Sequence, residues 1–429
     1  MMIGSKDLPG QLFLAILLTL LSGVASADVW TNENHWNDDW ESRFSDWVQK
    51  RYTHDIFTKG EYAGIAHDCA DSAYFARLLF AYENRLPFVI QDPAYEGEGS
   101  RRGASFDELI AENGPDSPYA IVEPLISNEM DYYDHLDEKT RVRRFMDFVG
   151  AVVWTKSLIN DTYPIQLNRK WFRPGVVAAL PRSRVFQTPS PLETMEGVWT
   201  AGHAQIVTGI GENGVIHYLK STMPAKVQPL RPTTMNSFSP GREGGSFRYW
   251  KQPGHFDSPE DSLPGYGTEQ FDLEGVFEDV MQKRLARAAV ESRSEKLERL
   301  SGEICGHLYE RVPVVMEAWR HKLKIGETRC MDYRDYDIHS TPTRDGKIRK
   351  TLARLLRVAT GNEAGDFAQV ADTIDKVCGD IEYMPGETLQ AGIASRHLLS
   401  GSASSDPNQP PAVRWGLVAA GASDCRSFY

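Results

Sequence analysis

The sequence predicts an α+β protein, in which a domain of helices and antiparallel strands precedes a mostly helical domain. Three observations support this prediction. Apolar residues recur at helical spacing up to about residue 158, follow a period of two in short runs between 175 and 250, and return to helical spacing from 270 to 380. The length of 429 residues suits two or three domains. A composition that is 41% hydrophobic and 25% charged excludes a fibrous or wholly disordered chain.

The first 27 residues have the features of a secretory signal peptide. Lys6 precedes the apolar run 12–18, and Ala25-Ser26-Ala27 forms a small-x-small site that predicts cleavage before Asp28. The apolar run is shorter than the roughly 20 residues that a membrane helix needs. We therefore expect an exported protein, periplasmic or extracellular, with no stable membrane span after cleavage.

Residues 28–255 are expected to form the first domain, beginning with helices. Trp36, Trp40, Phe44 and Trp47 recur every three or four residues, which is typical of one helix face. Further helices are predicted over 69–85, where Pro87 ends the pattern, and over 137–158. Residues 92–118 are rich in Gly, Ser and Pro and are expected to be a loop.

The strands are expected in the second half of this domain. Gly211-Glu212-Asn213-Gly214 separates two of the β-like runs and is typical of a hairpin turn. The predicted strands are 175–180, 205–210, 215–219 and 246–250.

The remainder of the chain is predicted to be a linker, a helical domain and a tail. Residues 256–268 are rich in Pro, Gly, Ser and Asp, as linkers often are. Residues 269–398 are expected to be helical, with Pro313 interrupting one helix. Residues 399–429 contain few apolar side chains and are expected to be disordered.

Charge and motif content exclude several kinds of ligand. The chain has 47 Lys plus Arg against 59 Asp plus Glu, a net charge of −12, which argues against nucleic-acid binding through bulk positive charge. Neither C-x-x-C nor H-E-x-x-H occurs, so neither a metal site nor a cofactor is expected.

The five cysteines divide into one and four. Cys69 is isolated, and the other four lie in the C-terminal third of the chain. In an oxidising compartment an odd count leaves one thiol free, so Cys69 is the expected free thiol. The other four are expected to form at least one disulfide, and two disulfides among them could be connected in three ways. They are Cys305, Cys330, Cys378 and Cys425.

Cys69 has the position expected of a nucleophile. It opens a predicted helix after Asp68, a possible N-cap, and the positive end of a helix dipole stabilises a thiolate. Asp68 and Asp71 oppose this effect because nearby negative charge raises the pKa of a thiol. His203 begins one predicted strand and is the candidate base, while His217 in the next strand is the candidate third group.

Together these segments resemble the NlpC-like papain-fold cysteine peptidases. The resemblance is carried by Tyr62-Ala63-Gly64, Asp68-Cys69, Pro174-Gly175, Gly202-His203 and Val215-Ile216-His217. It implies a papain-like first domain with Cys69 as nucleophile, His203 as base and His217 orienting that base. It also implies a substrate-binding set of Tyr62, Asp68 and Asp71.

The sequence departs from the family pattern at several points. Ala70 and Asp71 follow the cysteine where the family has Ser and Gly, and Val176 stands where Asp is common. Residues 92–165 would be a large insertion, expected to form a lid or a wall over the cleft. The hairpin adds a geometric condition: a turn symmetric about Glu212 and Asn213 would put His203 and His217 on opposite faces, whereas a Gly bulge would restore one face.

The functional expectation is an exported cysteine hydrolase that cleaves an amide bond, by resemblance in cell-wall peptide. A transglutaminase-like acyl transferase has the same Cys-then-His order, but that family expects an acid on the next strand, and residues 215–218 contain none. A non-catalytic binding protein that keeps the fold is the third possibility. The sequence does not indicate a protein partner.

Overall fold

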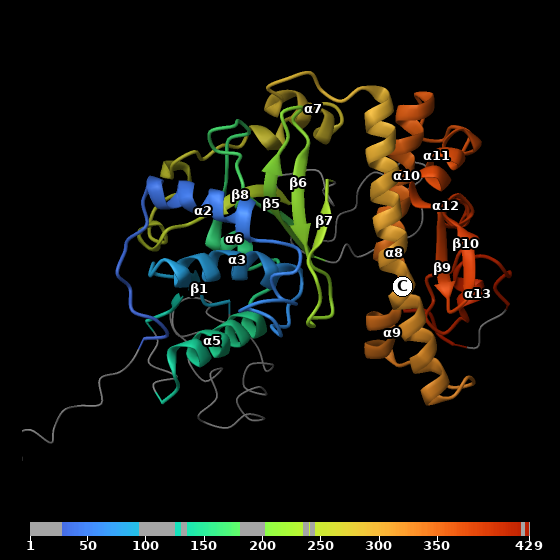
Figure 1. Ribbon diagram of the computed structural model, residues 1–429, viewed down its shortest axis with the longest axis horizontal. Coiled ribbons are helices and arrows are strands. Elements are labelled where there is room, and N and C mark those ends of the chain that lie inside the picture. The colour runs from blue at the N-terminus through green and yellow to red at the C-terminus, as the bar shows by residue number, and fades with distance from the viewer. Residues whose placement is uncertain are drawn as a thin grey trace, which may run out of the picture.

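The structure is a computed structural model that describes residues 28–93, 125–129, 135–180, 202–234, 240, 245–421 and 425–428. The predicted signal peptide lies outside these residues. The described chain is mixed α+β with antiparallel sheets and forms two adjoining parts, drawn in blue to yellow and in orange to red in Figure 1. The predicted fold class is confirmed at this level.

A six-stranded antiparallel sheet forms the centre of the first domain. Its strand order is β3-β8-β4-β5-β6-β7, and the central pairs join β4 to β5 and β5 to β6. The predicted strands are present with small shifts at their ends. The strands are β3 (Thr162–Pro164), β4 (Val177–Leu180), β5 (His203–Ile210), β6 (Ile216–Lys220), β7 (Arg231–Thr233) and β8 (Ser246–Trp250).

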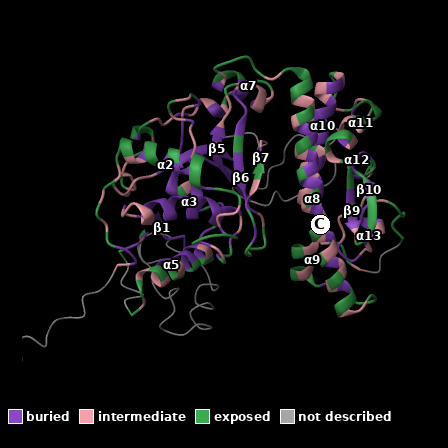
Figure 2. Cartoon of the chain, viewed as in Figure 1, coloured by how far each residue is buried: buried purple, intermediate pink, exposed green. Residues whose placement is uncertain are grey.

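Three helices lie on one side of this sheet. They are α2 (Asp38–Arg51), α3 (Cys69–Glu83) and α5 (Glu138–Val152). The first two lie against its strands and the third, α5, lies against α3. Phe44 and Trp47 of α2, Phe75 of α3 and Phe145 of α5 share one buried cluster with Ile206 of β5. Figure 2 shows α3 buried along its length between α5 and the sheet. This packing fixes the first residue of α3 against the sheet.

The other face of the sheet packs against α7 (Phe277–Leu285). Phe277 and Met281 of this helix join a second buried cluster with Tyr218 and Phe247. Helix α7 therefore belongs to the first domain, although the sequence assigned it to the second. Three short 3-10 helices precede it: η2 (Pro253–His255), η3 (Glu260–Ser262) and η4 (Glu269–Phe271).

The predicted insertion is part of the core where the structure describes it. Within 92–165, α5 carries Phe145 and Val149 into the main cluster, and β3 forms an edge of the central sheet. Strand β1 (Val89–Gln91) pairs with β2 (Leu125–Ser127), and the short α6 (Leu158–Asp161) leads into β3. The expectation of a lid is wrong for these residues, because their apolar faces are needed to cover α3.

The predicted linker at 256–268 is also packed. Leu263 is buried, the Tyr163 hydroxyl donates a hydrogen bond to the Pro264 carbonyl at 2.9 Å, and Gly265 (φ +77°) lies against the Trp171 ring. A side chain at Gly265 would collide with that ring. Polar composition therefore did not indicate a linker here, and the connection between the domains is 286–292, after α7.

The second domain is built on α8 (Arg293–Ile325), a helix that continues through Pro313 instead of ending there. Its apolar side pairs with α10, as the shared cluster of Leu300, Leu308 and Leu352 shows. Among the described residues no helix is both long and apolar enough to cross a membrane. The other elements are α9 (Tyr333–His339), α10 (Pro342–Thr360), α11 (Ala368–Cys378), β9 (Asp380–Met384), β10 (Glu387–Gln390), α12 (Ala391–Ser400) and α13 (Pro411–Arg414).

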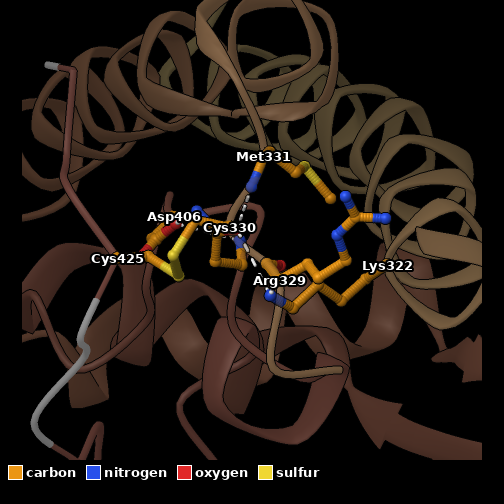
Figure 3. Close-up of a disulfide and its surroundings, with 7 residues drawn as sticks. Lys322, Arg329, Cys330, Met331, Asp406 and Cys425 are labelled. Carbon is orange, nitrogen blue, oxygen red and sulfur yellow. Dashed lines mark hydrogen bonds between the residues drawn. A yellow bond between two sulfur atoms is a disulfide. The ribbon is translucent and has the colours of Figure 1, made fainter. Parts of the chain in front are cut away.

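The tail is not disordered over its described residues. Helix α13 is followed by Trp415, which is fully buried in the core of the helical domain. One disulfide joins Cys330 to Cys425 beside Lys322, Arg329 and Asp406 (Figure 3), which ties the tail to the segment after α8. The prediction of disorder was wrong because it relied on the average apolar content of the tail, whereas single large residues such as Trp415 anchor it.

A second disulfide joins Cys305 of α8 to Cys378 at the end of α11. Cys69 is the remaining cysteine and is free. The prediction that the four C-terminal cysteines form disulfides and leave Cys69 unpaired is confirmed. Both bridges lie inside the helical domain.

The two domains meet through polar side chains. Figure 1 shows α8 running alongside the edge strand β7, and Arg231 and Thr233 of that strand bond to Glu310 and Glu303 of α8. Within the described residues each buried apolar cluster belongs to one domain alone. Interfaces of this kind allow domains to move relative to each other.

Candidate functional site

Cys69 is the first residue of α3 and is 5% exposed. A capping box starts the helix: the Asp68 side chain accepts from the Ala70 and Asp71 N–H groups, and Asp71 accepts from the Asp68 N–H. The cap turns the chain sharply into the helix, so the thiol lies at the helix start as predicted. The neighbouring strand decides what the thiol faces.

The Cys69 sulfur faces the beginning of β5. It lies 3.9 Å from Thr155 Oγ1 and 4.0 Å from the Gly202 carbonyl oxygen, and the Ala204 N–H is directed at it. Helix α3 packs across β5, which holds this contact in place. A backbone N–H beside a nucleophile can stabilise negative charge that develops during acyl transfer.

The Cys69 thiol is protonated at neutral pH. Burial, and secondarily the Asp68 carboxylate, raise its pKa to about 11, while the Ala204 N–H, Thr155 and Lys347 oppose the rise. The helix dipole also lowers the pKa of the thiol, but the removal of the sulfur from water raises the pKa by more. The resting thiol is therefore not the nucleophilic thiolate.

His203 begins β5 but points away from the Cys69 side of the sheet. Ala204 and Ile206 pack towards α3, and since side chains alternate along a strand, His203 and Gln205 project from the other face. No hydrogen bond joins the Cys69 sulfur to the imidazole, and within the described residues His203 Nε2 has no partner. Burial lowers the pKa of His203 well below its usual value.

His217 does not complete a triad. Near the turn it pairs with Gly209, but a bulge then shifts the register, so Tyr218 pairs with Val207. Tyr218 and Val207 share the face of His203, and His217 therefore projects from the opposite face. The sequence left both arrangements open, and the bulge that forms, between Val207 and Gly209 of β5, keeps the two histidines on opposite faces.

Tyr62 lies at the wrong end of α3 to line the Cys69 site. Its hydroxyl donates a hydrogen bond to Glu83, the last residue of this 15-residue helix, which spans about 20 Å. Tyr62 instead borders a surface depression of about 600 Å³ together with Trp47 and Arg51. Its proximity to Cys69 in sequence did not predict proximity in space, because residues 63–68 connect one end of the helix to the other.

Asp68 and Asp71 are structural residues in this fold. Both carboxylates are used by the capping box, and Asp71 is only 3% exposed. Burial, and then Asp68, raise the pKa of Asp71 to about 8. A side chain so placed does not reach a substrate in the resting structure. The substrate-binding set implied by the resemblance is not assembled around Cys69.

Charged residues from both domains lie near His203, and sequence analysis did not single them out. After burial, Lys347 and Lys220 contribute most to lowering the His203 pKa, and Glu310 and His307 also act on it. Lys220 lies at the end of β6, Glu310 and His307 on α8, and Lys347 on α10. The single available signal was Lys220, a charged residue at the end of an apolar strand.

Lys347 is electrostatically coupled to both parts of the site. Cys69 raises its pKa and Lys347 in turn lowers that of His203. The site therefore lies at the junction of the two domains, with α10 on one side and the start of β5 on the other. Among described residues no group of three or more His, Cys, Asp or Glu could hold a metal ion.

Comparisons with protein-family models, with curated proteins and with solved structures found no match to this chain. The function is therefore inferred from the geometry of the site. That geometry comprises a free thiol at a helix start, a strand backbone facing it, and a buried histidine on the far face of that strand.

Proposed function

We propose that this protein is an exported cysteine hydrolase of amide bonds, with a papain-like arrangement of helix and sheet and Cys69 as its nucleophile. The observation that carries the proposal is the position of the free thiol. Cys69 begins α3, and its sulfur faces the Ala204 N–H at the start of β5. Export by way of an oxidising compartment agrees with the two disulfides.

The proposed reaction has two steps. The Cys69 sulfur attacks the amide carbonyl to form a thioester, and the thiol proton passes to the leaving amine. For His203 to relay this proton, the start of β5 must first rearrange, because the imidazole lies on the far face of the strand in the resting state. Water then hydrolyses the thioester, which releases a carboxylic acid and restores the thiol. The Ala204 N–H would stabilise the oxyanion in both steps.

The resting arrangement represents a latent state of this enzyme. The thiol and the imidazole are both buried and uncharged, and their side chains are on different faces of the strand. Separation of the helical domain from the sheet would admit water and a substrate to the start of β5. Polar interfaces such as this one open at modest energetic expense.

The test combines trapping and turnover. Incubation with short peptides and with cell-wall peptide fragments, followed by intact-mass measurement, should reveal an acyl group on Cys69 and released amine. Cys69→Ala should abolish both signals, while the Lys350→Met variant on the exposed side of α10 should retain them. Hydrolysis that persists in Cys69→Ala would exclude this nucleophile.

A non-catalytic binding protein is the second candidate, and one observation favours it. The structure places His203 and His217 on opposite faces, so no Cys-His-His triad exists in the resting state. In that case Cys69 would stay unacylated with every amide tested, both in the full chain and after its domains are loosened.

A further inference from the structure

Positive charge exceeds negative charge at the junction of the two domains. Four cationic side chains gather there from β6, β7 and α10, while the carboxylate that faces them comes from Glu310 on α8. The four cations are Lys220, Arg231, Arg344 and Lys347. Lys220 is buried and the other three are half-buried, so water screens the repulsion between these like charges only in part.

Glu310 balances two of these cations. Its carboxylate lies 3.5 Å from Lys220 Nζ and 3.6 Å from the Arg231 guanidinium, and 4.0 Å from His307 Nδ1. The remaining acids nearby are already engaged. Glu317 pairs with Lys226 at 3.6 Å, and Asp345 is buried against Arg311 at 2.7 Å.

Lys347 forms no ion pair within the described part of the chain, and Glu310, the carboxylate that attracts it, is already paired with Lys220. Lys220, which is itself held by Glu310, lies close enough to repel it, and Arg344 adds to the repulsion. Burial, followed by Lys220, lowers the pKa of Lys347 to about 7. A negative ligand would remove this repulsion.

A second observation at the same place also points to a ligand. The His203 side chain is 94% buried, since its exposed fraction is 6%, yet its Nε2 has no hydrogen-bond partner among the described residues. His203 shares its strand face with Gln205, whose pair on β6 is Lys220. The unpartnered nitrogen therefore lies on the side of the sheet from which the cations project.

We propose that the junction binds an anionic group of the carboxylate or phosphate class, with Lys347 as its main partner, Lys220 supporting it and His203 Nε2 donating a hydrogen bond. The bound anion would connect β5 and β6 to α10 and so hold the two domains together. This site does not depend on catalysis by Cys69.

The first test measures binding by calorimetry with the full chain at pH 6, where Lys347 is protonated. The probes are inorganic phosphate and acetyl-Ala-Ala with a free carboxylate or a terminal amide. Binding of phosphate alone identifies a free phosphate as the source, whereas binding of the carboxylate peptide but not its amide identifies a peptide carboxylate. Either result supports the site, and no binding of any probe overturns it.

Substitutions locate the binding. Lys347→Met should weaken binding of the probe at least tenfold, and Lys347→Arg should retain most of it. The matched control is Lys350→Met, an exposed lysine of the same helix, which should leave affinity unchanged. Equal affinity in wild type and Lys347→Met would refute the assignment.

Thermal unfolding separates a ligand site from a structural role for Lys347. Without anions, Lys347→Met should unfold at a higher temperature than wild type because an unpaired cation has been removed. Phosphate should then raise the midpoint of wild type and not that of the variant. A lower midpoint in Lys347→Met together with equal stabilisation of both proteins by phosphate would overturn the proposal.

Discussion

Lys220 Nζ of the sheet domain lies 3.5 Å from Glu310 Oε1 of the helical domain, and the two side chains are 3% and 11% exposed. Forming an ion pair so poorly hydrated replaces favourable hydration of both groups, so its net contribution is small, but removing one partner leaves the other charge buried and unpaired. The pair also brings α8 close to the strand that carries His203. The stability of the junction should therefore depend on this pair.

Glu310→Gln should lower the free energy of unfolding by about 3 kcal/mol, because Lys220 would remain buried without a counter-ion. The pKa of Glu310 is held well below its usual value, with Lys220 as the main favourable cause against the cost of burial. The stability that ionised Glu310 contributes is thus present above the pKa that Glu310 has in the unfolded chain. It is lost as pH falls through the pKa that Glu310 has in the folded protein. Urea unfolding at pH 7 and at acidic pH measures the difference.

A double variant provides the control for this prediction. Lys220→Met combined with Glu310→Gln removes both charges and should recover most of the lost stability. If Glu310→Gln alone leaves the urea midpoint unchanged, the pair does not hold the domains together.

Alkylation of Cys69 should be slow in the native protein and selective among the cysteines. With the pKa raised from 9.0 to about 11, the thiolate fraction at pH 8 falls roughly 100-fold. Iodoacetamide labelling with peptide mapping gives the rate and the position. Glu310→Gln should accelerate labelling by loosening the junction, and rapid labelling of the wild type at pH 7 would contradict the buried site.

His203 should affect turnover without setting the resting pKa of the thiol. His203→Ala should lower amide hydrolysis at least 100-fold, because the proton relay is lost. It should shift the pH profile of Cys69 alkylation little, since no hydrogen bond joins the two side chains. His217→Ala, on the other sheet face, is the control and should leave both readouts unchanged. A large fall in thiolate formation in His203→Ala would instead indicate a preformed ion pair.

The Cys330–Cys425 disulfide should account for much of the stability of the helical domain. It closes a separation of 95 residues, for which the chain-entropy account gives roughly 5 kcal/mol. Replacing both cysteines by Ser should lower the unfolding free energy by about that amount in urea, whereas Cys69→Ser should have a smaller effect. Intact stability in the double Ser variant would mean that Trp415 alone anchors the tail.

Asp71→Asn should stabilise the protein at pH 9 and change little at pH 4. The folded pKa of Asp71 is raised to about 8, so the fold favours the protonated form. That preference contributes stability at acidic pH, and the contribution is lost as pH rises through about 8. Unfolding midpoints should rise by about 3 °C for each kcal/mol gained. The exposed Asp46→Asn serves as the control, and a lower midpoint at pH 9 in Asp71→Asn would show that the capping bond needs the carboxylate.

Local patterns predicted the elements well. The spacing of Trp36, Trp40, Phe44 and Trp47 indicated α2, and the turn at 211–214 indicated the β5–β6 hairpin. These signals reside in neighbouring residues, where helix and strand periodicity act directly. The odd cysteine count similarly identified Cys69 as the free thiol.

Relations that depend on register and packing were not predictable in the same way. One bulge in β5 decides that His203 and His217 face apart, and sequence offered both outcomes. Tyr62 lies near Cys69 in sequence but is at the far end of α3. Lys347 approaches the site from a helix that no local pattern connects with Cys69, because the docking of two domains brings them together.

In the part of the chain that the structure describes, the backbone passes between the domains at the exposed connection 286–292, and neither disulfide spans it. A single proteolytic cut there would leave two fragments held together by non-covalent contacts. Dilution, salt or loss of the anion could then release the helical fragment without any reductant. The fragment bearing Cys69 would keep its own core and gain access to solvent at the start of β5.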